Sequence, residues 1–130
     1  MDIWALPTTD AILFLYEIKA ADAGASWITK IRKNNLATEW QTPIPGFNLG
    51  EPLIDENHIY VSGIGFVGKV DLVKGNYTWR QDGLYTKYKA NGFRRPHIMK
   101  DKVVFPIWNW SPNKFDKIIL DRASGKILEP

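Results

Sequence analysis

Short runs of alternating apolar and polar residues, separated by turn signals, make up most of the chain. Runs such as 58–62, 69–73 and 102–105 are rich in β-branched and aromatic residues, which is typical of half-buried strands. Groups of Gly, Asn and Asp, such as 74–76, stand between them and favour tight turns. The pattern predicts an all-β fold.

One segment, 9–23, can be interpreted in two ways. Its apolar residues have some helical spacing, but the run 12–18 is short, rich in β-formers and followed by Ala-Asp-Ala-Gly. A strand that ends in a turn explains this run as well as a helix does. We favour the strand.

The strand runs repeat along the chain. Residues 52–61 align with 96–105 at an offset of 44, and Asp71 and Gly75 correspond to Asp121 and Gly125 at an offset of 50. A weaker first copy begins near residue 6 and ends at Trp40. The sequence therefore predicts one domain, 1–130, built from three units at about 5–45, 46–91 and 92–130.

A repeat of this length, with four short strands in each copy, is typical of a propeller blade. A single four-stranded sheet cannot bury both of its faces, so neighbouring copies must cover one another and supply the core.

The units resemble the β-propeller repeat of the pyrroloquinoline-quinone (PQQ) type. In that repeat Pro-Ile-x-Asp-x-x-Val-Tyr-Val precedes a short strand and then Leu-Asp-x-x-x-Gly-Lys-x-x-Trp. Residues 52–61 with 71–79 match it, as do 96–105 with 120–126, and Glu129 stands where the last Trp would be. The resemblance implies blade-like antiparallel sheets of the PQQ/WD40 propeller type, and it is nearly silent on function.

The chain departs from that family in two respects. It has room for three blades, whereas closed propellers have at least four. It also has no calcium-ligand cluster and no vicinal cysteine pair, so we expect no cofactor and no metal.

Three blades leave an open sheet edge, which needs cover. The N-terminal segment could cover it. A second copy could instead pair with it, giving a homodimer through the open sheet edge or a dimer-completed ring, in which each chain is a partial propeller. A barrel-like or sandwich arrangement of the units is the third alternative.

Composition limits where the protein is expected to act and which classes of partner it is expected to bind. The chain has no cysteine, and its N-terminus has neither the basic region nor the apolar region of a signal peptide. We therefore expect a cytoplasmic protein. The longest apolar run, 11–16, is too short for a membrane span. The net charge of +3 is scattered along the chain rather than gathered in a stripe, so we expect neither nucleic-acid nor membrane binding.

The residues that could carry catalysis have simpler structural interpretations. His58 reads as a polar residue at a strand end, Asp71 and Asp121 as turn residues, and the glycine-rich run 63–68 as a strand connection. His97 is the better candidate base, but no carboxylate partner can be named for it. We therefore predict no catalytic residue and a protein that is not an enzyme, with a hydrolase-type enzyme using His97 as the alternative.

The strongest candidate surface is aromatic and basic. Trp108 and Trp110 lie in an insert that only the third unit has. Trp, Tyr and Arg are the residues that anchor protein interfaces. The predicted binding residues are Tyr85, Tyr88, Arg94, Arg95, His97, Trp108 and Trp110.

These residues predict a non-enzymatic binding protein that presents a rigid β-surface to a protein partner, as an immunity or inhibitor protein would. The alternative is a self-assembling half-propeller that binds a small ligand or carbohydrate, because paired aromatic rings also stack on sugars.

Overall fold

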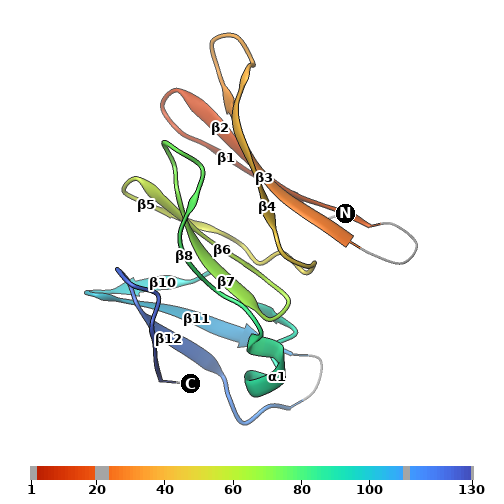
Figure 1. The fold of residues 1–130 in the computed structure, drawn as a ribbon, viewed down its shortest axis with the longest axis vertical. Helices are drawn as coiled ribbons and strands as arrows, with labels where there is room; N and C mark the ends of the chain where they lie inside the picture. Colours follow the sequence, from red (N-terminus) through yellow and green to blue (C-terminus); the bar gives the residue numbers. More distant parts are fainter. Residues whose placement is uncertain (1–2, 20–23, 110–111, 130) are drawn as a thin grey trace.

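The computed structural model describes residues 3–19, 24–109 and 112–129 and shows three antiparallel sheets, two of four strands and one of four strands with a short fifth. Figure 1 shows the sheets following one another along the long axis of the molecule, and they do not close a ring. We call them the first, second and third blades. This confirms the predicted all-β fold of blade-like sheets.

Each blade is a meander in chain order. The first contains β1 (Ile3–Pro7), β2 (Ala11–Lys19), β3 (Gly24–Arg32) and β4 (Thr38–Ile44). The second contains β5 (Leu53–Asp55), β6 (His58–Gly63), β7 (Phe66–Asp71) and β8 (Tyr77–Gln81). The third contains β10 (His97–Met99), β11 (Lys102–Trp108), β12 (Lys117–Asp121) and β13 (Ile127–Glu129). The short strand β9 (Gly92–Phe93) pairs with the end of β11.

The segment with two interpretations forms the strand β2, as favoured, and 63–68 is the hairpin between β6 and β7. One helix that the sequence did not indicate, α1 (Leu84–Tyr88), lies between the second and third blades. It has a left-handed residue at each end, Gly83 and Lys89. No helix in the described part of the chain is long and apolar enough to cross a membrane.

The core consists of two layers, one between each pair of neighbouring blades. Leu13, Leu15 and Ile28 of the first blade pack with Ile59 and Val61 of the second. A separate group joins the second and third blades: Tyr60, Val67, Trp79, Val103, Phe105, Ile118 and Leu120. The second blade thus buries one face against the first blade and the other against the third.

The same contact locks both blade pairs together. The indole N–H of Trp40 in β4 donates to the carbonyl of Leu72 at 3.1 Å, and Lys30 Nζ donates to that carbonyl at 2.9 Å. In the next interface Trp79 and Lys69 donate to the carbonyl of Arg122, at 3.0 and 2.9 Å. The register places Ile119 and Glu129 of the third blade at the equivalent positions, so the third blade has neither donor.

A glycine receives each of these tryptophans. A Cβ atom at Gly75 or Gly125 would lie 2.4 Å from the ring of Trp40 or Trp79, respectively, and both glycines have positive φ angles, +80° and +76°. Two separate requirements therefore select glycine, the left-handed backbone and the flat contact with the ring. In the first blade the corresponding turn has Leu36, with φ +60°.

The aspartates at these turns act as the sequence predicted. Asp71 Oδ1 accepts the amide hydrogens of Val73 and Lys74, at 2.8 and 2.9 Å. Asp121 makes the same pair of bonds in the third blade. The hydrogen bond from the Lys74 amide is the main reason that the pKa of Asp71 lies below its ordinary value. Both carboxylates therefore stabilise turns.

Candidate binding site

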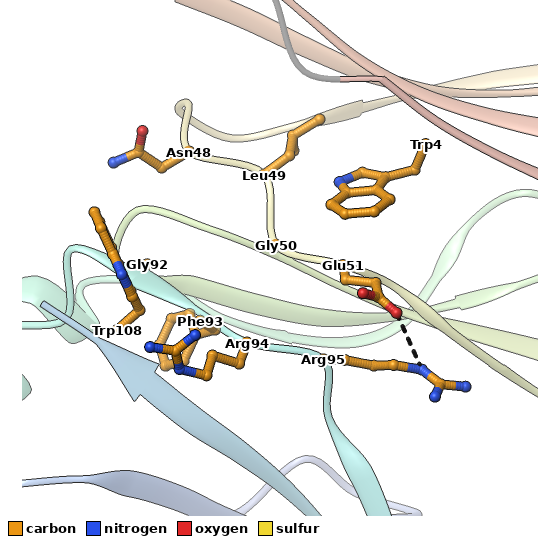
Figure 2. A pocket seen from close by; sticks show the side chains of 10 residues that line it. All are labelled: Trp4, Asn48, Leu49, Gly50, Glu51, Gly92, Phe93, Arg94, Arg95 and Trp108. Carbon is orange, nitrogen blue, oxygen red and sulfur yellow. Dashed lines mark ion pairs between the residues drawn. The ribbon is translucent and has the colours of Figure 1, made fainter.

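A hollow of about 350 Å³ lies beside the two connections that join the three blades, and we call it the three-blade hollow. The first blade contributes Trp4 from β1, and the third contributes Trp108 from the end of β11. The two connections between blades supply the remaining residues. These are Asn48, Leu49, Gly50, Glu51, Gly92, Phe93, Arg94 and Arg95. Figure 2 shows the ten side chains.

The first connection is fixed in place by close packing and hydrogen bonds. A Cβ atom at Gly50 would lie 2.3 Å from Ser62 Oγ and 2.5 Å from the carbonyl oxygen of Phe93. This position therefore accepts only glycine without displacement of the backbone. The backbone N–H of Asn48 donates to Glu17 Oε1 at 2.9 Å, and its side-chain Nδ2 donates to the carbonyl of Asn91 at 3.1 Å. Because these contacts reach every blade, the walls of the hollow are set by the blade packing.

Of the two arginines in the hollow, Arg95 has a carboxylate partner. Arg95 Nε lies 3.5 Å from Glu51 Oε2, and both side chains are about half exposed. Such an exposed pair contributes little stability. The guanidinium of Arg94 is exposed and makes no hydrogen bond or ion pair within the described residues. In Figure 2 the side chain of Arg94 extends toward Phe93 and Trp108, which line the same hollow.

A second hollow of about 300 Å³ continues the first along the neighbouring strands β1 and β5. The two hollows share Trp4, Glu51 and Arg95. Together they form one surface that runs along the first strands of the first two blades. Its walls are mainly apolar, and its cations lie on the side of the third blade.

The structure brings Arg94, Arg95 and Trp108 of the predicted set into this hollow. Trp110 lies outside the described residues. His97 is exposed on β10, directly across from Val104, and makes no hydrogen bond or ion pair within the described part of the chain. The geometry gives a base at His97 no carboxylate to orient it.

The two predicted tyrosines lie on α1, away from the hollow. Tyr88 is 2 % exposed and its ring meets that of Phe115 edge to face at a centroid distance of 5.1 Å. It therefore belongs to the core and is not available as a surface residue. Tyr85 is about half exposed and packs against Gly65.

Sequence reasoning missed Trp4, Asn48 and Glu51. Trp4 lies in the weakest copy of the repeat, and the other two lie in a connection that repeats nowhere else. The glycine at position 50 was the one available signal, because a glycine outside a predicted turn often marks a close backbone approach.

A more polar cleft of about 470 Å³ lies between the second and third blades, on the side of the turns. Arg122 forms an ion pair there with Asp55, and Lys69 binds the carbonyl of Arg122. Burial lowers the pKa of Lys69 and raises that of Tyr60. Arg122 and Lys69 already have partners within the chain, so these two cations serve the blade packing.

Comparison with known proteins gives a fold and no family. No protein-family model matches the sequence, and no curated protein matches it. Among solved structures, a europium-containing methanol dehydrogenase is similar over 95% of this chain, with a TM-score of 0.60 and 14% sequence identity. The fold is propeller-like. The chain covers 25% of the length of that dehydrogenase, and at this identity the likeness extends to the fold alone.

The dehydrogenase is named for its europium, and a metal ion in a protein needs several ligands that lie close together. Across residues 3–19, 24–109 and 112–129, three or more His, Asp or Glu side chains nowhere come together as a metal site requires. The polar side-chain groups around the three-blade hollow are two guanidinium groups, two indole N–H groups, one carboxylate and one amide. This set suits an anionic or hydrogen-bonding guest better than a cation.

Proposed function

We propose that the protein is a non-enzymatic binding protein and that the three-blade hollow holds an acidic, apolar segment of a protein partner. The proposal rests mainly on the unpaired guanidinium of Arg94 in a hollow that is also lined by the aromatic side chains of Phe93 and Trp108. Arg and Trp are the side chains that contribute most at protein interfaces. An acidic group on the partner would give Arg94 the counter-charge that this chain does not provide.

The rigidity of the site supports binding without rearrangement. Its residues come from the first and third blades and from the connections between blades, and Gly50 is wedged against the backbone of Phe93. A preorganised surface loses little conformational entropy when a partner binds. Such a surface would suit a partner-blocking protein of the immunity or inhibitor kind. The repeated Trp–Gly contacts support the further proposal that these blades are of the PQQ type.

The experiment is a quantitative pull-down with three forms of the chain. The test form carries Trp108→Ala and Arg94→Ala together, and the control carries Arg32→Ala, an exposed arginine on the rim of the first blade. A partner that binds at the hollow is retained by the wild type and by the control and is lost from the test form. Added salt should also weaken its retention. If the test form retains the same proteins, or the wild type retains none, the proposal is wrong.

The size of the hollow favours a second candidate, a small carboxylated aromatic ligand. Its volume of about 350 Å³ is in the range of small-molecule sites. Titration with phenylacetate and with the neutral phenylacetamide, followed by tryptophan fluorescence, tests this candidate. Arg94 should favour the acid over the amide, and equal binding of both would exclude a role for its charge.

A further inference from the structure

Within the described residues, one whole face of the first blade is covered by no other blade (Figure 1), and we call it the free face. The strand register places its side chains in three rows across the four strands. The rows are Ile3, Tyr16, Trp27 and Pro43; Ala5, Phe14, Thr29 and Gln41; and Pro7, Ile12, Ile31 and Thr38. Ile18 and Ala25 extend the face beyond the first row.

No Lys, Arg, Asp or Glu occupies any of these positions. Ile3 and Ile18 are more than half exposed, and Phe14, Trp27 and Ile31 are only half-buried. The corresponding residues of the second blade, such as Ile59 and Val61, are fully buried against the first blade. The free face therefore has the composition of a covered blade face without the cover, and exposed apolar faces of this extent mark interaction sites.

The turn beside the free face excludes a blade of the kind found inside this chain. Each internal contact sets a tryptophan on a glycine, Trp40 on Gly75 and Trp79 on Gly125. The free face has Leu36 at that place, with a left-handed backbone and a side chain that is 72% exposed. Since a Cβ atom at the glycine positions would lie 2.4 Å from the ring, Leu36 would collide with an incoming tryptophan.

The uncovered face of the third blade is also poorly suited to pack against the free face of the first blade. Its register positions include His97 across from Val104, Lys102 across from Asp121, and Lys117 across from Pro106. These charges would be placed against the rows of Ile, Phe and Trp, where burial without a counter-charge is strongly unfavourable. A head-to-tail contact between copies therefore matches less well than a contact between two apolar faces.

We infer that the free face is a dimer interface, occupied by the same face of a second copy around a two-fold axis. The strands β1 to β4 have five, nine, nine and seven residues. At about 3.3 Å per residue along a strand and about 4.8 Å between strands, the face of this sheet covers about 475 Å². The contact would therefore bury about 475 Å² of each copy before side-chain relief is counted, which is the size of a weak, reversible interface. Two-fold contacts of this kind are the commonest in homo-oligomers.

Three polar side chains in the middle row of the free face and beside it are hydrogen-bonded to one another. Gln41 Nε2 donates to the hydroxyl of Tyr16 at 2.8 Å and to Thr29 Oγ1 at 3.2 Å. The hydroxyl oxygens of Tyr16 and Thr29 lie 3.4 Å apart, within hydrogen-bond distance. A second copy can cover this network without leaving it unpaired, so the desolvation penalty is small.

Sedimentation velocity tests the inference through two substitutions and one matched control. Ile18→Lys places a charge at an exposed edge of the free face, where the folded monomer tolerates it. Phe14→Lys places a charge at the centre of the face. Ile119→Lys is the control, because the equivalent positions of the other blades are the native Lys30 and Lys69. Circular dichroism checks that each variant folds.

The wild type should sediment at twice the chain mass of 14.9 kDa. Ile18→Lys should weaken dimerisation at least about tenfold, since it buries an unpaired charge. Ile119→Lys should leave the dimer unchanged. The inference is overturned by a wild type that stays monomeric at about 100 µM. It is equally overturned by a dimer that survives Ile18→Lys, or by one that Ile119→Lys abolishes.

Discussion

The contact between Trp79 and Gly125 should carry much of the stability of the second blade interface. Trp79 is 8% exposed, its ring lies on Gly125, and its indole N–H binds the carbonyl of Arg122 at 3.0 Å. Replacing a buried tryptophan with alanine costs about 3–5 kcal/mol. We expect Trp79→Ala to lose about 3–4 kcal/mol, because Lys69 still donates to the Arg122 carbonyl and leaves it satisfied.

Two further variants separate the ring from the glycine. Trp79→Phe keeps most of the apolar contact, so we expect it to lose about 1–2 kcal/mol. Gly125→Ala introduces left-handed strain of about 1 kcal/mol together with the clash against the ring. In the double variant Trp79→Ala/Gly125→Ala the clash disappears. The two changes should therefore couple by at least about 1 kcal/mol.

Equilibrium unfolding in urea, followed by circular dichroism, measures the free energies of unfolding of the wild type and of these variants. Trp40→Ala is the internal comparison, and since Trp40 is only half-buried it should lose less than Trp79→Ala. The reasoning fails if Trp79→Ala loses less than about 1 kcal/mol, or if the two changes are additive within about 0.3 kcal/mol.

Two other predictions follow from single residues. Leu36→Gly should raise the free energy of unfolding by up to about 1 kcal/mol, because Leu36 has a positive φ angle and an exposed side chain, and a lower value in urea unfolding would contradict this. Burial raises the pKa of Tyr77 to about 12. Above pH 10 the unfolded chain then loses this proton while the folded chain keeps it, so stability should fall between pH 10 and 12. Tyr77→Phe should reduce that fall, and an unchanged slope in thermal melts would exclude this tyrosine as its source.

The repeats made the blades predictable, and the reason is local. Residues 52–61 and 96–105 each contain a strand, a turn and a strand, so neighbouring residues alone decide their structure. The equivalent placement of Trp40 and Trp79 was also visible. The glycine that each ring meets was not, because Gly75 and Gly125 lie in the following blade.

The candidate site was only partly predictable, because distant segments build it. Arg94, Arg95 and Trp108 attract attention by residue type, and they do line the three-blade hollow. Trp4 reaches it from the other end of the chain. Tyr88 has the same residue type as a surface anchor, yet the helix α1 turns it into the core. Residue type alone cannot separate these cases.

The shape of the three-blade hollow depends more on the hydrogen bonds of Trp79 and Lys69 between the second and third blades than on contacts within the hollow. The ion pair between Arg95 and Glu51 is half exposed and contributes at most about 1 kcal/mol. It cannot hold the third blade against the first connection. Trp79 and Lys69, bound to the carbonyl of Arg122, fix that distance from the opposite edge of the blades. A variant that loosens this lock should therefore separate Arg95 from Glu51 and weaken binding at the hollow, although it touches no residue there.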